Sequence, residues 1–536
     1  MKLKYLLILV LFIALKTYSQ DSSNVLFKID NEPYYSSEFL AVYKKNLNIV
    51  SDTEDNTIEK YLQMFVDYKL KVKSAKAIGL DTVKSYKSEL EQYKKALVLP
   101  YLKDENVTNK LVKEAYDRLI KEVNVSHILI FLKPEATPAD TLAAYNELLA
   151  ARKLIIEGSP FSDIAKKYSK DPSVKENGGE IGYFTALQMV YPFENMAYAT
   201  PLGEVSMPFR TKFGFHILKV NDIRNSEGEV EVAHIMLKNN TDATAKKMDS
   251  IYKLIESNPS DFEKLAKNLS EDNASAPNGG RLKKFNSGQM INAFSDVAFS
   301  LQTIGEISKP FHTPYGWHII KLINKYPIED FEALESKLLS QVENDDRSNL
   351  IGKSVIERLF KEYNIVVSKD ALNQFNEGDW KNSPENFQQI LIKIQEKDIY
   401  QNKFIQFLNK GNNQSISAAF KVFKETEVLN YYKENIEFNN AEFAATYKEF
   451  EEGLLLFEML EKQVWEKSKD SIGLINYFES NKSTQYVGKD LNNNKGQIIS
   501  DYQNYLEKMW VKELHQKYKV EFIENEKKHI LKTKFN

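Results

Sequence analysis

Residues 212–219 read KFGFHILK, and residues 314–321 read PYGWHIIK. The two stretches lie 102 positions apart and share a glycine, a histidine, an apolar residue pair and a lysine in the same order. Self-similarity at a fixed period is the sequence signature of a duplicated structural unit. The chain is therefore expected to contain two copies of one domain.

Further matches extend the duplication upstream at nearly the same offset. The matching pairs, in chain order, are VSHIL 125–129 with VAHIM 232–236, NGG 177–179 with NGG 278–280, QM 188–189 with QM 289–290, Phe193 with Phe294, and PF 208–209 with PF 310–311. These pairs predict one domain at 121–225 and a second at 228–326, which we name the first repeat and the second repeat.

Both repeats have the same predicted order of secondary structure. A short β-rich apolar run comes first, at 123–132 and at 230–237, and helical stretches follow. The NGG turn leads into a short strand, at 181–184 and at 282–285, and each repeat closes on a strand that begins near its last histidine. Strands and helices that alternate around one sheet predict the α+β fold class.

Histidine is scarce in this chain, with seven residues in 536, and five of the seven lie inside the repeats. The five are His127, His216, His234, His312 and His318. In each repeat one histidine lies on the first strand and one at the start of the last strand. An aspartate, Asp171 or Asp272, precedes the second histidine by 45 or 46 residues. The preserved spacing predicts that these side chains act together.

The ordered motifs of both repeats resemble the parvulin family of peptidyl-prolyl cis/trans isomerases, over about 200 of the 536 residues. The resemblance implies small antiparallel sheets with surrounding helices, and an activity that needs no cofactor and no metal. The catalytic residues that it implies are His127, Asp171, Thr211 and His216 in the first repeat, and His234, Asp272, Thr313 and His318 in the second. The implied pocket for the proline ring consists of Met189 and Phe193, and of Met290 and Phe294.

These residue types suit the rotation of an X-Pro bond, which crosses a barrier of about 20 kcal/mol without any covalent change. A catalyst must bind the twisted amide more tightly than either planar form. The twisted amide has lost its resonance and is less polar, so a dry pocket of Met and Phe favours it. Histidines joined through their ring nitrogens are expected to tune the electrostatics, and the aspartate either to fix a tautomer or to interact with the strained carbonyl region.

Each feature has a plainer interpretation when it is taken alone. A strand histidine is more often a hydrogen-bonded core residue, and Met and Phe are more often ordinary core. His312 with His318 suggests a metal, but a third ligand at a useful spacing is missing. The hydrolase motifs GxSxG and HExxH do not occur. Only the joint recurrence of all the features favours a functional site.

The N-terminus has the pattern of a secretory signal peptide at 1–19. Lys2 and Lys4 precede an unbroken apolar run from Leu6 to Leu15, which is too short to span a bilayer. Its removal takes away three lysines and no acid, so the formal net charge changes from −3 to −6. A mildly acidic chain argues against nucleic acid as the main partner. The absence of cysteine excludes disulfides and thiolate chemistry.

The flanking regions, 20–120 and 327–536, are predicted to be mainly helical, and they resemble the helical parts of parvulins of the SurA and PpiD kind. Asp81 and Thr108 are predicted N-caps. A strand is expected at 25–29 and another at 520–523, which by the same resemblance packs back against the N-terminal region. Residues 369–414 match no pattern, and 481–496 read as a polar loop.

The sequence therefore predicts an isomerase and chaperone in the periplasm of a Gram-negative envelope. Its expected partners are unfolded or nascent envelope proteins with X-Pro bonds, outer-membrane proteins among them. The alternative is a non-catalytic holdase or assembly factor whose repeats only bind peptides. The complete residue set in both repeats favours the enzyme.

Overall fold

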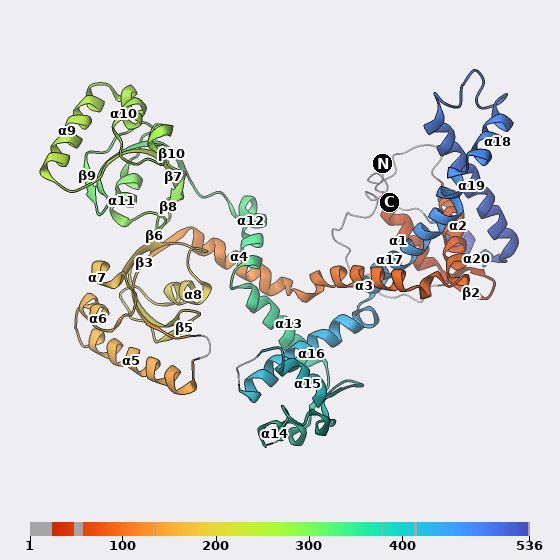
Figure 1. Ribbon diagram of the computed structural model, residues 1–536, viewed down its shortest axis with the longest axis horizontal. Coiled ribbons are helices and arrows are strands. Elements are labelled where there is room, and N and C mark those ends of the chain that lie inside the picture. The colour runs from red at the N-terminus through yellow and green to blue at the C-terminus, as the bar shows by residue number, and fades with distance from the viewer. Residues whose placement is uncertain (1–23, 48–56, 134–135, 378, 412–414, 534–536) are drawn as a thin grey trace. The chain divides into compact units, whose positions relative to one another are not determined.

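The structure is a computed structural model that describes residues 24–47, 57–133, 136–377, 379–411 and 415–533. The predicted signal peptide lies outside these described residues. The chain divides into two compact units. The terminal unit comprises the residues up to Leu99 and from Lys433 onward, and the central unit runs from Pro100 to Tyr432. Both units mix helices with sheet (Figure 1), and the predicted α+β class is confirmed.

The first repeat is a four-stranded antiparallel sheet, in the order β4-β3-β6-β5, with four helices (Figure 1). Its elements are β3 (Lys121–Phe131), α5 (Pro138–Ile156), α6 (Phe161–Tyr168), α7 (Val174–Asn177), β4 (Glu180–Phe184), α8 (Tyr191–Ala199), β5 (Phe209–Thr211) and β6 (Gly214–Asn225). The central strands β3 and β6 alternate their side chains between two apolar clusters, one centred on Ile128 and Ile217, the other on Val125 and Leu218.

The second repeat has the same topology, in the order β8-β7-β10-β9. Its elements are β7 (Glu229–Leu237), α9 (Asp242–Ser257), α10 (Phe262–Leu269), β8 (Phe285–Asn286), α11 (Asn292–Ser300), β9 (Phe311–Thr313) and β10 (Gly316–Tyr326). The strand predicted at 282–285 is shorter than expected. The Leu282 N–H still donates to Val232 (2.9 Å), so this segment follows β7, but a continuous ladder begins only at Phe285.

Three helices of the central unit pack against one another outside the repeats: α4 (Glu105–Leu119), α12 (Phe331–Asn344) and α13 (Ser348–Glu362). Their shared core includes Leu111, Val112 and Leu338. The prediction that Thr108 caps α4 is wrong, because the Asp104 side chain accepts the Val107 N–H and forms the N-cap. Thr108 lies inside the helix and donates its hydroxyl to the Asp104 carbonyl (2.8 Å).

A small three-stranded sheet follows α13 in the region that matched no sequence pattern. Its strands are β11 (Ile365–Val367), β12 (Ile390–Ile394) and β13 (Lys397–Tyr400), and the nearby helices are α14 (Lys369–Glu377), α15 (Gln401–Leu408) and α16 (Ile416–Asn439). The flanking region 327–536, predicted to be mainly helical, thus also contains strand, and the β-branched run of β11 pairs with β12.

The terminal unit joins two distant parts of the chain in one sheet, in the order β14-β1-β2. The strands are β1 (Val25–Ile29), β2 (Glu32–Tyr35) and β14 (Val520–Phe522). The helices are α1 (Ser36–Leu47), α2 (Ile58–Ala77), α3 (Lys84–Leu97), α17 (Ala441–Leu460), α18 (Ser471–Asn481), α19 (Lys495–Lys517) and α20 (Glu524–Lys532). The predicted packing of the C-terminal strand against the N-terminal region is confirmed by the antiparallel pair Phe27 and Phe522.

Short helical turns connect several of these elements. The 3-10 turns are Leu80–Thr82, Leu99–Leu102, Pro259–Asp261, Ala276–Asn278, Pro384–Asn386 and Lys467–Lys469, and Glu461–Trp465 is a π-helical turn. Gly79 ends the α2 segment with a φ of +76°, but the N-cap of α3 is Val83 and not the predicted Asp81. Within the described ranges, no helix combines the length and the apolar composition that a membrane crossing needs.

A buried ion cluster lies among three helices of the terminal unit. The Lys69 ammonium on α2 is 1% exposed and contacts Glu38 of α1 (2.5 Å) and Glu452 of α17 (2.6 Å). Tyr68 donates its hydroxyl to the same Glu452 carboxylate (2.7 Å). A buried charge is tolerated only when it is paired and hydrogen-bonded, and here one ammonium satisfies two carboxylates.

Candidate functional site

The structure brings the four predicted catalytic side chains of the first repeat together. His127 lies on β3 and His216 on the adjacent β6, and their rings stack with centroids 5.7 Å apart. His127 Nε2 lies 2.8 Å from an Asp171 carboxylate oxygen, and His216 Nε2 lies 2.8 Å from the Thr211 hydroxyl. Both rings and the threonine are buried, whereas the Asp171 side chain keeps 24% of its surface exposed. The carboxylate therefore forms the edge of the site that faces solvent.

The second repeat builds the same arrangement from its own residues. The rings of His234 and His318 stack with centroids 5.6 Å apart. His234 Nε2 lies 2.8 Å from Asp272, and His318 Nε2 lies 2.8 Å from the Thr313 hydroxyl. Two copies with different surrounding sequences thus keep one geometry.

The glycine pair of each NGG turn holds the first histidine in place. The Gly179 carbonyl accepts the His127 N–H (2.8 Å), and Gly179 itself has a φ of +90°. A Cβ at this position would lie 2.6 Å from the His127 carbonyl oxygen, a distance that no side chain tolerates. Gly280 approaches His234 in the same way. The turn therefore requires glycine both for its backbone conformation and for its closeness to the histidine strand.

Aromatic rings line the histidine pair in each repeat. Phe193 on α8 meets His127 and His216 edge to face, at 5.7 and 5.4 Å, and Phe209 stacks on His216 at 5.5 Å. In the second repeat Phe294 and Phe311 make the same contacts. The partly buried methionines pack against the same clusters, Met189 in the first repeat and Met290 in the second.

The sequence analysis did not assign Phe209 and Phe311 to the site. Both stand in the repeated PF motif, so the recurrence of a phenylalanine seven positions before the second histidine was the available signal. Each ring stacks on the second histidine of its repeat, which in turn stacks on the first histidine, and both imidazoles are buried.

Burial sets the charge state of the rings. It lowers the pKa of His216 to about 3 and that of His318 to about 4, and the neighbouring histidine adds to both effects. Burial also lowers the pKa of His127 and of His234, although the hydrogen bond to an aspartate opposes it. The rings are therefore neutral at neutral pH.

The aspartates remain ionised beside these neutral rings. Burial raises the pKa of Asp171 and of Asp272, but hydrogen bonds from neighbouring serines and from the histidine outweigh it and hold both pKa values below the usual range. A neutral ring next to a carboxylate donates, so His127 gives its Nε2–H to Asp171, and His234 gives its own to Asp272.

The expected joining of the two histidines through their ring nitrogens is not what the structure shows. Nε2 of one ring pairs with an aspartate and Nε2 of the other with a threonine, while the buried Nδ1 atoms of all four rings have no partner among the described residues. The rings interact face to face. His127 lies opposite Leu218 and His216 opposite Leu129, so the two histidines are diagonal neighbours on one face of the β3–β6 pair.

One serine distinguishes the two sites. Ser275 is 4% exposed, donates its hydroxyl to the Asp272 carboxylate and lies 3.0 Å from His234 Nε2. The equivalent position of the first repeat is Val174, and there Ser173 donates instead to the other Asp171 oxygen (2.8 Å). The Asp272 oxygen that faces the ring thus has one more donor than its counterpart.

Replacing Ser275 by alanine is expected to raise the pKa of Asp272 and to leave that of Asp171 unchanged, because a donor to the ionised carboxylate is lost. Carboxyl-carbon NMR titration measures both. The matched variant Ser173→Ala should raise the pKa of Asp171 alone. An Asp272 pKa that stays the same or falls in Ser275→Ala would contradict this assignment of the hydrogen bond.

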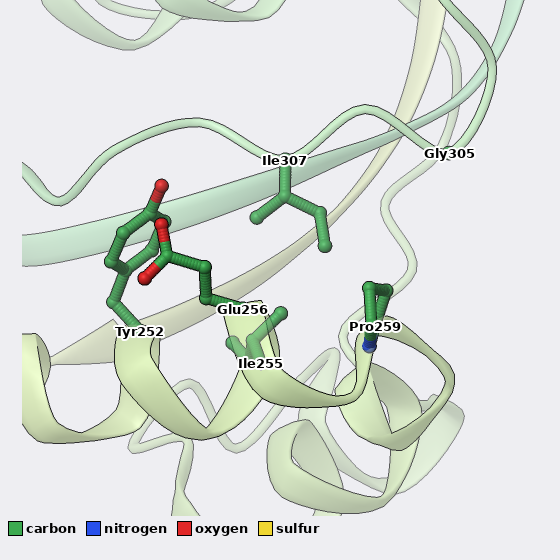
Figure 2. A pocket seen from close by; sticks show the side chains of 6 residues that line it. All are labelled: Tyr252, Ile255, Glu256, Pro259, Gly305 and Ile307. Carbon is green, nitrogen blue, oxygen red and sulfur yellow. The ribbon is translucent and has the colours of Figure 1, made fainter.

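A hollow of about 250 Å³ in the second repeat is separate from the histidine site. Figure 2 shows Tyr252, Ile255 and Glu256 of α9 facing Ile307 across it. Ile255 and Ile307 belong to the apolar cluster on one face of the sheet, whereas Phe294 and Met290 belong to the cluster on the other. None of the predicted site residues lines this hollow.

His312 lies outside the histidine pair and meets Trp317 edge to face at 5.6 Å. Over the described ranges, no three His, Cys, Asp or Glu side chains are grouped closely enough to hold a metal ion.

Comparison with protein families matches both repeats to one description. The model of the "PPIC-type PPIASE domain" matches residues 109–224, and a second model with the same description matches residues 232–324. Among solved structures, the peptidylprolyl isomerase PrsA of Bacillus anthracis is 29% identical, with a TM-score of 0.19, over 25% of this chain and 60% of that one. The parvulin NmPin of Nitrosopumilus maritimus is 34% identical, with a TM-score of 0.16, over 19% of this chain and 95% of that one.

Curated relatives extend the similarity beyond the repeats. The protein named Chaperone SurA of Pseudomonas syringae pv. tomato is 31% identical over 284 residues, which are 48% of this chain and 65% of the relative. Chaperone SurA of Pseudomonas aeruginosa is 30% identical over 48% of this chain and 67% of the relative. The chain thus spans slightly less than two thirds of the first of these relatives. With two PPIC-type domains in tandem and this similarity, the chain belongs to the SurA family.

Proposed function

We propose that this protein is a peptidyl-prolyl cis/trans isomerase and chaperone that assists the folding of envelope proteins. The observation that carries the proposal is the site built twice: two stacked neutral histidines, an ionised aspartate at the edge and a buried threonine, next to Phe and Met. Domains at 121–225 and 228–326 would each hold one site, between helical regions at 20–120 and 327–536.

The geometry suits the stabilisation of a twisted amide. In the first repeat, Phe193 and Met189 would bind the proline ring, and the neutral imidazoles present no charge to the less polar twisted bond. The Asp171 carboxylate stands at the exposed edge of the site, where it would lie next to the rotating carbonyl of a bound X-Pro peptide. It also fixes the His127 tautomer by accepting the Nε2–H.

The partners and the location follow from the family and the N-terminus. Proteins named Chaperone SurA are similar to this chain, which supports unfolded envelope proteins as the class of client. The charged start and the apolar run of residues 6–15 support export to the periplasm. Outer-membrane proteins with X-Pro bonds are the clients that we propose.

The test is isomerisation of a short X-Pro peptide by the protein without residues 1–19, compared with Asp171→Ala, Asp272→Ala and the double variant. Loss of a charge-assisted hydrogen bond costs about 1.5–3 kcal/mol, so kcat/KM should fall about tenfold or more at each altered site. The double variant should lose both contributions. Asp249→Ala, on the exposed face of α9, is the control that should keep full activity.

An inactive wild-type protein that still suppresses the aggregation of an unfolded client would contradict the enzymatic proposal. That result would indicate a holdase whose repeats only bind peptides. Equal activity of the wild type and the double variant would refute the role of the two aspartates.

A further inference from the structure

Next to Phe193, helix α8 carries a carboxylate with no exposed surface, that of Glu194. Its Oε1 accepts hydrogen bonds from Arg118 Nη1 (3.0 Å) and from Arg347 Nη2. Arg118 lies near the end of α4 and Arg347 directly before α13, so both guanidinium groups come from outside the first repeat. Arg347 is itself fully buried, and its second carboxylate partner is Asp345. A charge at such depth is stable only with its partners in place.

The other oxygen of Glu194 holds the turn that carries the methionine of the pocket. Oε2 accepts the Leu187 N–H (2.8 Å), two residues before Met189. Leu187 has a φ of +66°, a left-handed conformation that is unfavourable for a residue with a side chain. A single carboxylate therefore fixes both walls of the pocket, the Met189 turn and the Phe193 helix.

The aromatic residues of α8 strengthen this connection to the helices outside the repeat. The Arg347 guanidinium lies over the Tyr191 ring at 4.4 Å, and Arg118 lies over the same ring at 5.6 Å. Leu187 and Tyr191 also pack against the apolar core shared by α4, α12 and α13. The pocket side of the first repeat is thus continuous with these helices.

The second repeat forms the same turn without a buried charge that connects it to helices outside the repeat. Gly288 stands where the first repeat has Leu187 and adopts a φ of +87°, which costs glycine little. Ser295 stands in place of Glu194, and its hydroxyl has no hydrogen-bond partner among the described residues. No buried charge holds the Met290 turn. Its hydrogen bonds run from the Asn286 N–H to the Gln289 side chain (3.1 Å), and from the Gln188 amide of the first repeat to the Asn286 side chain and the Ser287 carbonyl.

We propose that Glu194 is a positioning residue for the proline pocket of the first repeat, and that Arg118 and Arg347 make this pocket depend on α4 and α13. The inference rests on the proposed function in that the pocket binds proline. It goes further in making the two sites unequal: a displacement of α4 or α13 alters the first site directly, and reaches the second only through the hydrogen bonds of Gln188.

The test uses Glu194→Gln in the full chain with Asp272→Ala as background, so that activity reports the first repeat. The glutamine amide has a single acceptor oxygen, and the two guanidinium groups would donate to it. Its NH₂ group, which cannot accept a hydrogen bond, then faces the Leu187 N–H. We expect kcat/KM for an X-Pro peptide to fall roughly 10- to 100-fold, as for a displaced binding group. Hydrogen exchange should accelerate across residues 185–193 and much less across 286–294, which contact the altered turn only through Gln188. Ser295→Ala is the matched control in the second repeat and should change neither readout.

Leu187→Gly, added to Glu194→Gln, separates positioning from general stability. If Glu194 acts through the strained turn, glycine should restore slow exchange around Met189 and most of the activity, as Gly288 does in the other repeat. A uniform loss of stability that glycine does not relieve, or unchanged exchange in Glu194→Gln, would overturn the proposal. A background variant without any isomerase activity would refute catalysis by the first repeat, and the exchange measurement would still decide the role of Glu194.

Discussion

Replacing Lys69 by alanine is expected to lower the free energy of unfolding of the terminal unit by about 3 kcal/mol or more. The substitution leaves the carboxylates of Glu38 and Glu452 without the ammonium that contacts both of them. Lys448 still reaches Glu38 (2.9 Å), which keeps the loss near the lower end of the range for a broken buried pair. Urea unfolding of the full chain, with hydrogen exchange of α2 and α17 as the readout, measures the free energy of unfolding of the terminal unit.

Lys45→Ala is the matched control, because Lys45 also joins α1 to α17, through Glu449, but both side chains are largely exposed. An exposed pair contributes about 0–1 kcal/mol, so this variant should be close to the wild type. Adding Glu452→Gln to Lys69→Ala should recover part of the lost stability. A Lys69→Ala protein as stable as Lys45→Ala would show that the cluster contributes no more than a surface pair.

Lowering the pH from 7 to 4.5 is expected to destabilise each repeat by about 2–3 kcal/mol. In the folded state burial lowers the pKa of His216 to about 3 and that of His318 to about 4, against 6.5 in the unfolded chain. Below pH 6.5 the unfolded chain binds a proton that the folded repeat does not, so stability is complete above this pH. It falls down to about pH 3 in the first repeat and to about pH 4 in the second, and the measurement covers the window from pH 7 to 4.5. Asp171 and Asp272, whose pKa values are lowered, stay ionised in the folded state over this window.

Urea unfolding at the two pH values, followed segment by segment with pulsed hydrogen exchange, measures this effect on β6 and β10. His318→Gln should flatten the pH dependence of the second repeat and leave that of the first unchanged. His312→Gln replaces an exposed histidine that adds a smaller contribution to the lowered pKa of His318, so it should weaken the pH dependence of the second repeat less than His318→Gln does and leave the first unchanged. A second repeat that keeps its full pH dependence after His318→Gln would disprove the assignment to this ring.

The duplication made much of the central unit predictable from sequence. Two copies that diverged around the same His, Asp and NGG positions served as an internal comparison, and the order of strands and helices followed from the spacing of the motifs. The structure brings each predicted set together, His127 with Asp171 and His216 with Thr211. The roles of these residues in catalysis stay predictions until the aspartate variants are measured.

What the sequence did not reveal depends on contacts between distant or unpatterned residues. Arg347 lies 153 positions from Glu194, and no periodicity relates them. The strands β11 to β13 have only three to five residues each, so their pattern is too short to distinguish from loop. The caps of α3 and α4 differ from prediction because Val83 and Asp104, and not the nearby Asp81 and Thr108, have the extended backbone that a cap requires.

The pairing of β14 with β1 sets the order in which the parts of a newly made chain become native. Phe27 and Phe522 are 495 positions apart. Protein synthesis adds about 5–20 residues per second, so roughly 25–100 s pass between the synthesis of β1 and that of β14. Each repeat, in contrast, closes its sheet within about a hundred residues, and short loops close at a smaller entropic cost. During that interval the unpaired edge of β1 is open to other extended chains. The repeats therefore reach their native state first, and the terminal sheet is the last part of the molecule to close.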